Sequence, residues 1–147
     1  MHFLLKVDDA QKGVDTYAEH KTVLDRLGTV WFGKFGTGLS RRISEISRRQ
    51  LESGQTTVLF LSQRARVQYC GRVVEILSGR YHGKCLPRDT KYIPKYYRDQ
   101  PCGVWFRLAS LRPVRSSELM NISLFNDPTL RPSHRIMRPL IYVTTPL

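Results

Sequence analysis

Runs of apolar residues along the chain indicate where its strands lie. HFLLKV at 2–7 is a short apolar run with a lysine near its end, and it predicts an opening strand. TVWFGKF at 29–35 predicts a second strand that runs into a glycine turn. Further runs rich in Val, Thr, Leu and aromatic residues predict strands at 55–63, 67–77 and 103–114. The RAR sequence between the first two of these runs indicates a hairpin connection.

Two other segments have the spacing of helices. Residues 9–27 carry apolar side chains at mixed helical spacing and end at Gly28, a plausible C-cap. Residues 39–54 form the clearer helix, with Ser40 as a candidate N-cap and Gly54 at its end. The other face of this second helix carries four arginines, which solvent exposure explains about as well as contact with nucleic acid does.

The remaining segments are loops. Gly, Pro and charged residues exclude a long regular element from 78–102, yet four tyrosines gather there. The tail at 126–147 holds four prolines, so we expect it to run extended over the surface. Strands and helices in this order predict one α+β domain over residues 1–147, with a curved, largely antiparallel sheet.

The charge of the chain indicates a polyanionic partner. Lys and Arg number 24 against 12 Asp and Glu, which gives a formal net charge of +12. No apolar stretch is long enough to span a membrane, and the first residues become charged too early for a secretory signal. Three cysteines without a CxxC pair suit a reducing compartment. We therefore expect a cytoplasmic protein that is not associated with a membrane.

Motifs of common enzymes are missing from the sequence. It has no GxxxxGK[ST], GxGxxG, HExxH, GxSxG or CxxC, and its histidines and cysteines do not have metal-ligand spacing. We expect no enzymatic activity, no metal and no cofactor. The alternative is a nuclease or a base-modifying enzyme, which would depend on Asp8 or Asp15 in the acidic cluster near the start of the chain.

Aromatic side chains interleaved with Arg and Lys are the remaining candidate for chemistry. Such combinations stack flat bases while the cations hold phosphates. We assign Trp105, inside the apolar run VWFRL, to the core. The other candidates are Trp31, Tyr81, Tyr92, Tyr96 and Tyr97.

Four blocks of the sequence, taken in order, resemble the YTH domain and its relative the EVE domain, both of the PUA-like superfamily. They are HFLLKVDD, TVWFGKF, TVLFLSQRARVQYCGRVVEIL and GVWFRLASLRPVRSSELMNISLFNDPTLRPSHR. Lys6 with Asp8 match the end of the family's opening strand, and Trp31 matches the Trp that forms one wall of a cage around a methylated base. Further matches are Tyr69 and Gly71 in the hairpin, and Leu119, Ile122, Leu124 and Asn126 after the last long strand.

The chain departs from the family pattern in two places. The second cage wall in the family is a loop Trp, and here only tyrosines stand in that loop. An aromatic ring of another type offers a similar stacking surface, so Tyr92, Tyr96 and Tyr97 are the candidates for this wall. The closing Arg-Asp-Gly run is also missing, and Arg135 in SHRIMRP is a loose match for the phosphate-binding arginine.

The resemblance implies a non-catalytic reader that inserts a flipped or single-stranded methylated base, 6-methyladenine above all, into an aromatic cage. It implies that Trp31 is half-exposed; the alternative is a Trp packed under the long loop. Asp8 and Phe32 would meet the base edge. The residues expected to hold the nucleic-acid backbone are Lys6, Lys34, Arg41, Arg42, Lys95, Arg98 and Arg135.

Several properties stay open at the level of sequence. EVE domains are the common prokaryotic form, so we expect a prokaryotic monomer, either alone or joined to an effector as the targeting module of a modification-dependent restriction system acting on methylated DNA. The end of the chain at IYVTTPL is consistent with a domain of a longer protein. A non-selective RNA- or ribosome-binding PUA-like protein is the other alternative. The sequence does not distinguish methylated DNA from methylated RNA.

Overall fold

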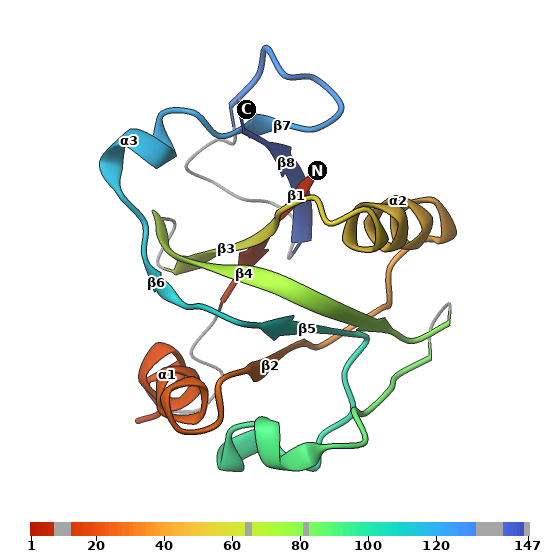
Figure 1. Cartoon of the computed structure of the whole chain (residues 1–147), viewed down its shortest axis with the longest axis vertical. Helices are drawn as coiled ribbons and strands as arrows, with labels where there is room; N and C mark the ends of the chain where they lie inside the picture. Colours follow the sequence, from red (N-terminus) through yellow and green to blue (C-terminus); the bar gives the residue numbers. More distant parts are fainter. Residues whose placement is uncertain (8–12, 64–65, 81–82, 132–139, 146–147) are drawn as a thin grey trace.

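The computed structural model describes residues 1–7, 13–63, 66–80, 83–131 and 140–145. Within them, eight strands form one curved sheet in the order β2-β5-β4-β3-β1-β8-β7, with β6 beside β4 (Figure 1). The strands are β1 (His2–Lys6), β2 (Val30–Lys34), β3 (Thr57–Gln63), β4 (Arg66–Ser78), β5 (Val104–Leu108), β6 (Arg112–Pro113), β7 (Ser123–Leu124) and β8 (Leu140–Thr144). The helices are α1 (Thr16–Leu27), α2 (Arg41–Glu52) and α3 (Ser116–Leu119), with the 3-10 turns η1 (Thr90–Tyr92) and η2 (Lys95–Tyr97).

Strand pairing is antiparallel except between β1 and β3, which run parallel. The sheet does not close, because the path of paired strands ends at β2 on one side and at β7 on the other. The α+β class and the largely antiparallel sheet expected from the sequence are therefore confirmed. None of the helices within the described ranges has the length and apolar character needed to cross a membrane.

One face of the curved sheet, which we call the inner face, carries the main core. Phe3, Phe32 and Phe106 are buried there together with Val23 of α1 and Ile43 of α2. Each of these side chains contributes about 1.5 to 3 kcal/mol by leaving water. The rings of Phe3 and Phe106 lie 4.9 Å apart, so strands β1 and β5 meet in the same core although they are not paired.

Local capping fixes where the two long helices begin and end. The side chain of Asp15 accepts a hydrogen bond from the backbone of Ala18, so α1 begins after Asp15. Gly28 takes a left-handed conformation at φ 86° and ends α1, as the sequence predicted. Ser40 is the N-cap of α2, again as predicted. The helix ends at Glu52, before Gly54, which was predicted to end it.

Two predictions about the second half of the chain are wrong. The run 103–114 is not one strand: β5 ends at Leu108, and β6 is a separate short strand that pairs with β4. The tail does not only run over the surface, because Leu140–Thr144 pairs with β1 and buries Val143 completely. Leu140 and Tyr142 pack against the main core cluster, whereas Ile141 and Val143 pack on the opposite face of the sheet, and the pairing with β1 decides this conformation.

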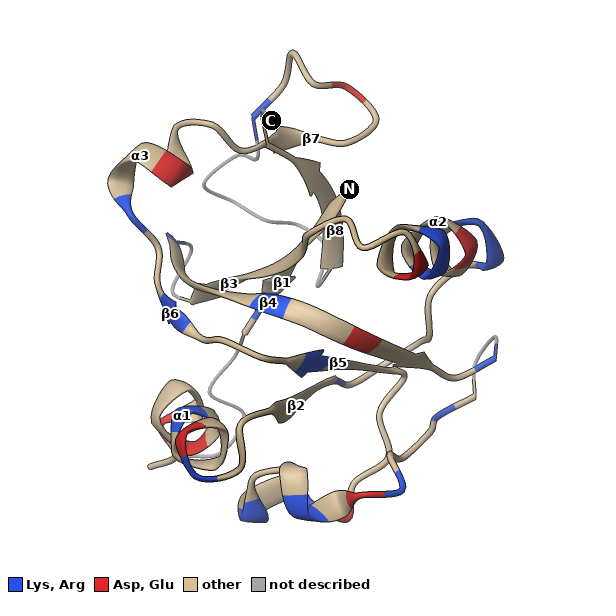
Figure 2. Ribbon diagram, in the orientation of Figure 1, with Lys and Arg blue, Asp and Glu red and all other residues tan. Residues whose placement is uncertain are grey.

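The opposite face of the sheet, which we call the outer face, carries two smaller clusters. One contains Leu4, Phe60 and Val143, and the other contains Trp31 and Trp105. Exposed residues of β4, including Arg72 and Glu75, lie between β3 and β5 in the sheet. Charged residues on β4 and β5 are visible in Figure 2.

Candidate functional site

The second outer-face cluster is built on two rows of residues that cross β2, β5 and β4. Trp31 pairs with Arg107, which pairs with Glu75 in the next strand. Two residues further along, Gly33 pairs with Trp105, and Trp105 pairs with Leu77. Because side chains alternate between the faces of a strand, both rows point to the outer face.

Trp31 is buried in this cluster, with only 4% of its surface exposed. It packs with Ile93 and Tyr97 from the loop that joins β4 to β5. The expectation of a half-exposed Trp31 is therefore wrong, because the long loop covers the ring. Trp105 is completely buried, which confirms its assignment to the core.

Gly33 makes room for the ring of Trp105. A Cβ atom at position 33 would lie 2.7 Å from the indole of Trp105 and 2.8 Å from the sulfur of Cys102, distances that real Cβ atoms do not show. The indole nitrogen of Trp105 donates a hydrogen bond to the carbonyl of Cys85, at 2.8 Å. The backbones of Cys85 and Cys102 exchange two hydrogen bonds, at 2.8 and 3.0 Å, as an isolated antiparallel pair. These contacts hold the start of the long loop next to the residues that lead into β5.

Tyr97 is a buried structural residue of this cluster. Its ring stacks on Trp105 with 5.6 Å between centroids and 12° between planes. Its hydroxyl lies 2.5 Å from Nε2 of His20 in α1, and it accepts a hydrogen bond from the backbone N–H of Gly33 at 3.2 Å. Burial raises the pKa of Tyr97, so the hydroxyl keeps its proton.

The hydrogen-bond partners of His20 define its tautomer. Nδ1 lies 2.6 Å from the carbonyl of Thr16, which can only accept, so Nδ1 carries the proton. Burial lowers the pKa of His20 to about 4, and the ring is neutral at pH 7. Nε2 is therefore the acceptor, and the single proton of the Tyr97 hydroxyl goes to His20.

Arg107 contacts the rings of both Trp31 and Tyr92. Its guanidinium carbon lies 4.9 Å from the ring centroid of half-buried Tyr92 and 5.7 Å from that of Trp31. Nε of Arg107 donates to the hydroxyl of Thr29 at 3.0 Å, and one terminal nitrogen lies 3.5 Å from the carboxylate of Glu75. Arg107 was not among the residues predicted from the sequence, because only the register of β2 and β5 places it opposite Trp31.

Two further aromatic residues, Tyr96 and Phe35, lie next to Tyr97 at the border of the cluster. Tyr96 is half-buried, with its ring 4.6 Å from that of Tyr97 and edge-on to His20 at 6.2 Å. Phe35 is 49% exposed and lies 6.3 Å from Tyr97. Phe35 was also missed, although an apolar ring between Lys34 and Gly36 in a turn is a sequence signal for an exposed aromatic residue.

Phe32 does not have the position expected of a base-edge contact. Its side chain is buried on the inner face and stacks on His20, with 4.1 Å between ring centroids. The reason is strand alternation, which points Phe32 away from the face that carries Trp31. Asp8 and Tyr81 lie outside the described residues.

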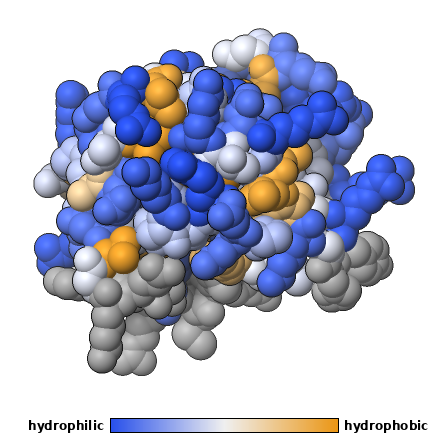
Figure 3. Space-filling view, turned by 90° about the horizontal axis from the view of Figure 1, so that it is seen from below, coloured by the Kyte–Doolittle hydropathy of each residue, from blue (hydrophilic) through white to orange (hydrophobic). Residues whose placement is uncertain are grey.

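The residues expected to bind the nucleic-acid backbone differ in position and in what their side chains contact. Lys34 donates to the carbonyl of Thr37 at 3.2 Å, and Arg98 donates twice to the carbonyl of Ile93, at 2.9 and 3.0 Å, so both hold the local loop structure. Burial lowers the pKa of Lys34. Lys95 is exposed on η2 beside the cluster. The side of the molecule that lies at the bottom of Figure 1 is largely hydrophilic, with separate hydrophobic patches (Figure 3).

Of the other basic candidates, Lys6, Arg41 and Arg42 are not brought together with Trp31. Lys6 is exposed on β1, which β3, β4 and β5 separate from β2. Arg41 and Arg42 are exposed in the first turn of α2. Arg135 lies outside the described residues. Further along α2, Arg48 and Arg49 are paired with Glu45, and Arg48 also with Glu52, so part of this helix face is neutralised.

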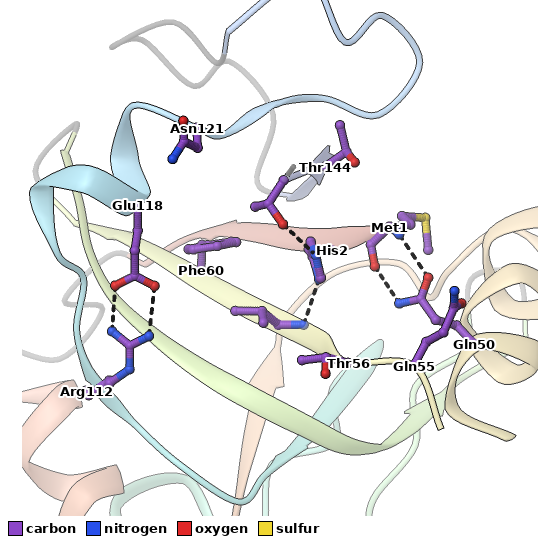
Figure 4. Close-up of a pocket in the computed structure, with 12 residues that line it drawn as sticks. Met1, His2, Gln50, Gln55, Thr56, Phe60, Arg112, Glu118, Asn121 and Thr144 are labelled. Atoms are coloured by element: carbon purple, nitrogen blue, oxygen red, sulfur yellow. Dashed lines mark hydrogen bonds and ion pairs between the residues drawn. The ribbon is translucent and has the colours of Figure 1, made fainter. Parts of the chain in front are cut away.

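A hollow of about 780 Å³ lies over the other end of the sheet, around His2 and Phe60 (Figure 4). Its charged side chains are paired with each other: Arg112 donates twice to Glu118, at 2.7 and 2.8 Å. This pairing lowers the pKa of Glu118 to about 2. His2 accepts a hydrogen bond from the backbone of Val58, so the polar groups of the hollow chiefly hold strands and helices together.

The described residues show no features of a metal centre or a disulfide. No group of three or more His, Cys, Asp or Glu residues in the described part of the chain could hold a metal ion. Cys70, Cys85 and Cys102 are free thiols, and burial raises the pKa of each. Chemistry in the described residues is therefore concentrated in the aromatic and cationic groups.

The chain forms a small α+β domain with a curved, open and largely antiparallel sheet that carries an aromatic cluster on its outer face. A family model described as Pua-like matches residues 3–137, and the chain belongs to this family. No curated protein and no solved structure matches the sequence. Membership of the PUA-like family points to binding of RNA or another nucleic acid.

Proposed function

We propose that this domain is a non-catalytic reader of methylated nucleic acid that holds a methylated base, 6-methyladenine above all, between Trp31 and Tyr92. The observation that carries the proposal is the shared guanidinium of Arg107, which lies over both rings. A guanidinium and a base are both flat groups that stack on aromatic faces. Two rings that contact the same flat cation can contact a base in the same space.

The energies of such a site are adequate for binding. Stacking of one base on an aromatic ring contributes about 1 to 3 kcal/mol, and burying a methyl group adds about 0.8 kcal/mol. The methyl group by itself therefore gives only several-fold selectivity. Further discrimination requires polar groups that accept the remaining N–H of the methylated amine, because leaving it buried and unpaired is costly.

Access to Trp31 requires side chains to move. The ring is 4% exposed, and the loop between β4 and β5 covers it. Tyr92 stands at the end of η1 and is only half-buried, and Arg107 is also half-buried. Arg107 is the side chain that a nucleobase would displace from between the rings of Trp31 and Tyr92, while Trp105 and Tyr97 stay in place beneath the site.

The second candidate function is non-selective binding of single-stranded RNA on the outside of the loop. The burial of Trp31 favours it, because the rings available without rearrangement are those of Phe35, Tyr92 and Tyr96. The exposed side chain of Lys95 would contact phosphates beside them. This candidate predicts equal affinity for methylated and unmethylated strands.

Titration of matched methylated and unmethylated oligonucleotides, both single strands and duplexes, tests the proposal. We expect tighter binding of the methylated form, with single strands or easily flipped sites preferred over intact duplex. Equal affinities would support the second candidate and exclude the first. Incubation with the same nucleic acids and a panel of divalent ions should leave them uncleaved and chemically unchanged; turnover would contradict a non-catalytic role.

A further inference from the structure

The guanidinium of Arg107 lies over both aromatic rings of the proposed site. Arg107 is the cross-strand neighbour of Trp31, and its side chain is 27% exposed, so the guanidinium covers aromatic surface without being sealed in. The distances of 4.9 Å to Tyr92 and 5.7 Å to Trp31 are within the range of cation–π contacts. The space in which a base would stack is therefore filled by a flat group from the protein itself.

We propose that Arg107 competes with the base for the space between Trp31 and Tyr92, and that it must leave this space before a base can stack there. This inference rests on the proposed function. In the free protein Arg107 keeps the two aromatic faces out of water. In the complex its released guanidinium lies beside the bound nucleotide, where it neutralises a phosphate.

The contacts that hold Arg107 allow this movement. Its only described ion-pair partner, Glu75, is 52% exposed and 3.5 Å away, a geometry that contributes little in water. The hydrogen bond to Thr29 at 3.0 Å is the better of the two and fixes the direction of the guanidinium. Neither partner is buried, so both are satisfied by water when Arg107 moves.

Binding of an uncharged methylated nucleoside isolates the competition, because it has no phosphate for Arg107 to contact. We expect Arg107→Ala to bind N6-methyladenosine about 5- to 30-fold more tightly than the unchanged protein, as expected when a cation–π competitor is removed. The ratio of affinities for methylated and plain adenosine should stay the same, because Arg107 must leave for either. Thr29→Val, which loosens Arg107 without touching the rings, should give a smaller gain.

Two more measurements complete the test. For a single-stranded oligonucleotide, Arg107→Ala should lower the slope of log affinity against log salt by about 0.7, since one phosphate contact is lost. Quenching of Trp fluorescence by acrylamide should rise in Arg107→Ala, and because Trp105 is completely buried, the change would report Trp31. Melting temperature confirms that each variant is folded.

The failure of this inference and the failure of the proposed function give different results. If the unchanged protein prefers the methylated nucleoside but folded Arg107→Ala binds it equally or more weakly, Arg107 is part of the binding surface and does not compete. If neither protein distinguishes methylated from plain nucleoside, the reader function fails. Absence of nucleoside binding by both proteins overturns both proposals.

Discussion

The hydroxyl of Tyr97 donates a hydrogen bond to Nε2 of His20 over 2.5 Å, and this contact joins the long loop to α1 across 77 positions of sequence. Because Tyr97 also stacks on Trp105 and accepts from Gly33, it fixes the loop over the outer face. The position of Tyr92 at the end of η1, and with it the second wall of the proposed site, depends on this anchorage.

Tyr97→Phe tests the anchorage directly. The substitution keeps the ring but leaves Nε2 of His20 and the N–H of Gly33 without their partner, which should destabilise the fold by about 1 to 3 kcal/mol. Urea denaturation at pH 7 measures the change. Tyr92→Phe is the matched control, since the described residues offer its hydroxyl no hydrogen bond, and it should stay within about 0.5 kcal/mol. Equal effects of the two substitutions would show that the hydroxyl of Tyr97 has no anchoring role.

The buried His20 should make stability depend on pH. Its pKa is lowered from 6.5 to about 4 in the folded protein, so the unfolded chain binds the proton more readily. This contribution to stability is fully present above pH 6.5, and it is lost as the pH falls towards 4. It amounts to at most roughly 3 kcal/mol.

Urea midpoints between pH 7.5 and 4.5 measure this dependence, and His20→Gln should flatten it. Part of the dependence should remain in the variant, because burial also lowers the pKa of His2 to about 4. An unchanged pH profile in His20→Gln would show that His20 is not the titrating group.

Gly33→Ala should disturb the packing of Trp105 and Cys102 in the aromatic cluster. The added methyl group would overlap the indole of Trp105 and the sulfur of Cys102, both of which are completely buried and cannot move away freely. We expect a loss of about 1 to 3 kcal/mol in the free energy of unfolding. Near-UV circular dichroism should also change, because Trp105 and the stacked Tyr97 shift together. A variant with the stability and spectrum of the unchanged protein would contradict this packing.

Affinity for nucleic acid should fall steeply with salt, because the chain carries a formal net charge of +12. Lys95→Gln should lower the salt slope for a single strand by about 0.7, since Lys95 is exposed beside the aromatic cluster. Arg48→Gln removes the same charge from α2, where Arg48 is paired with Glu45 and Glu52, and should change the slope less. Equal slopes for the two variants would place the nucleic acid elsewhere on the protein.

The sequence predicted those parts of the fold that local patterns determine. The strand at 2–7, the hairpin strands and the caps at Ser40 and Gly28 follow from alternation and from backbone conformation, and the structure confirms them. The division of 103–114 was missed because it depends on the register of β4 with its partners: the pairing of β4 with β5 shifts between Val73 and Glu75. That shift is a property of two strands together, which a single run of residues does not reveal.

The same limit applies to the site. Alternation in VWF places Trp31 on the face opposite to Val30 and Phe32, so it argues against the base-edge role that was predicted for Phe32. Alternation does not reveal what covers the face that carries Trp31. The cover is a loop whose position depends on the contact between Tyr97 and His20. Arg107 could be recognised only once the register of β2 and β5 was known.

The nuclear Overhauser effects between a ¹³C-labelled N6-methyl group of a bound oligonucleotide and the aromatic protons of the protein test the central proposal most directly. If the methylated base lies between the two rings, its methyl protons should show cross-peaks to both Trp31 and Tyr92. The cross-peaks to Tyr92 should be lost in Tyr92→Ala, and the slope of affinity against salt should persist. Cross-peaks from the methyl group to Phe35 and Tyr96 without Trp31, or to Phe60 in the hollow around His2, would contradict a methylated base held at Trp31.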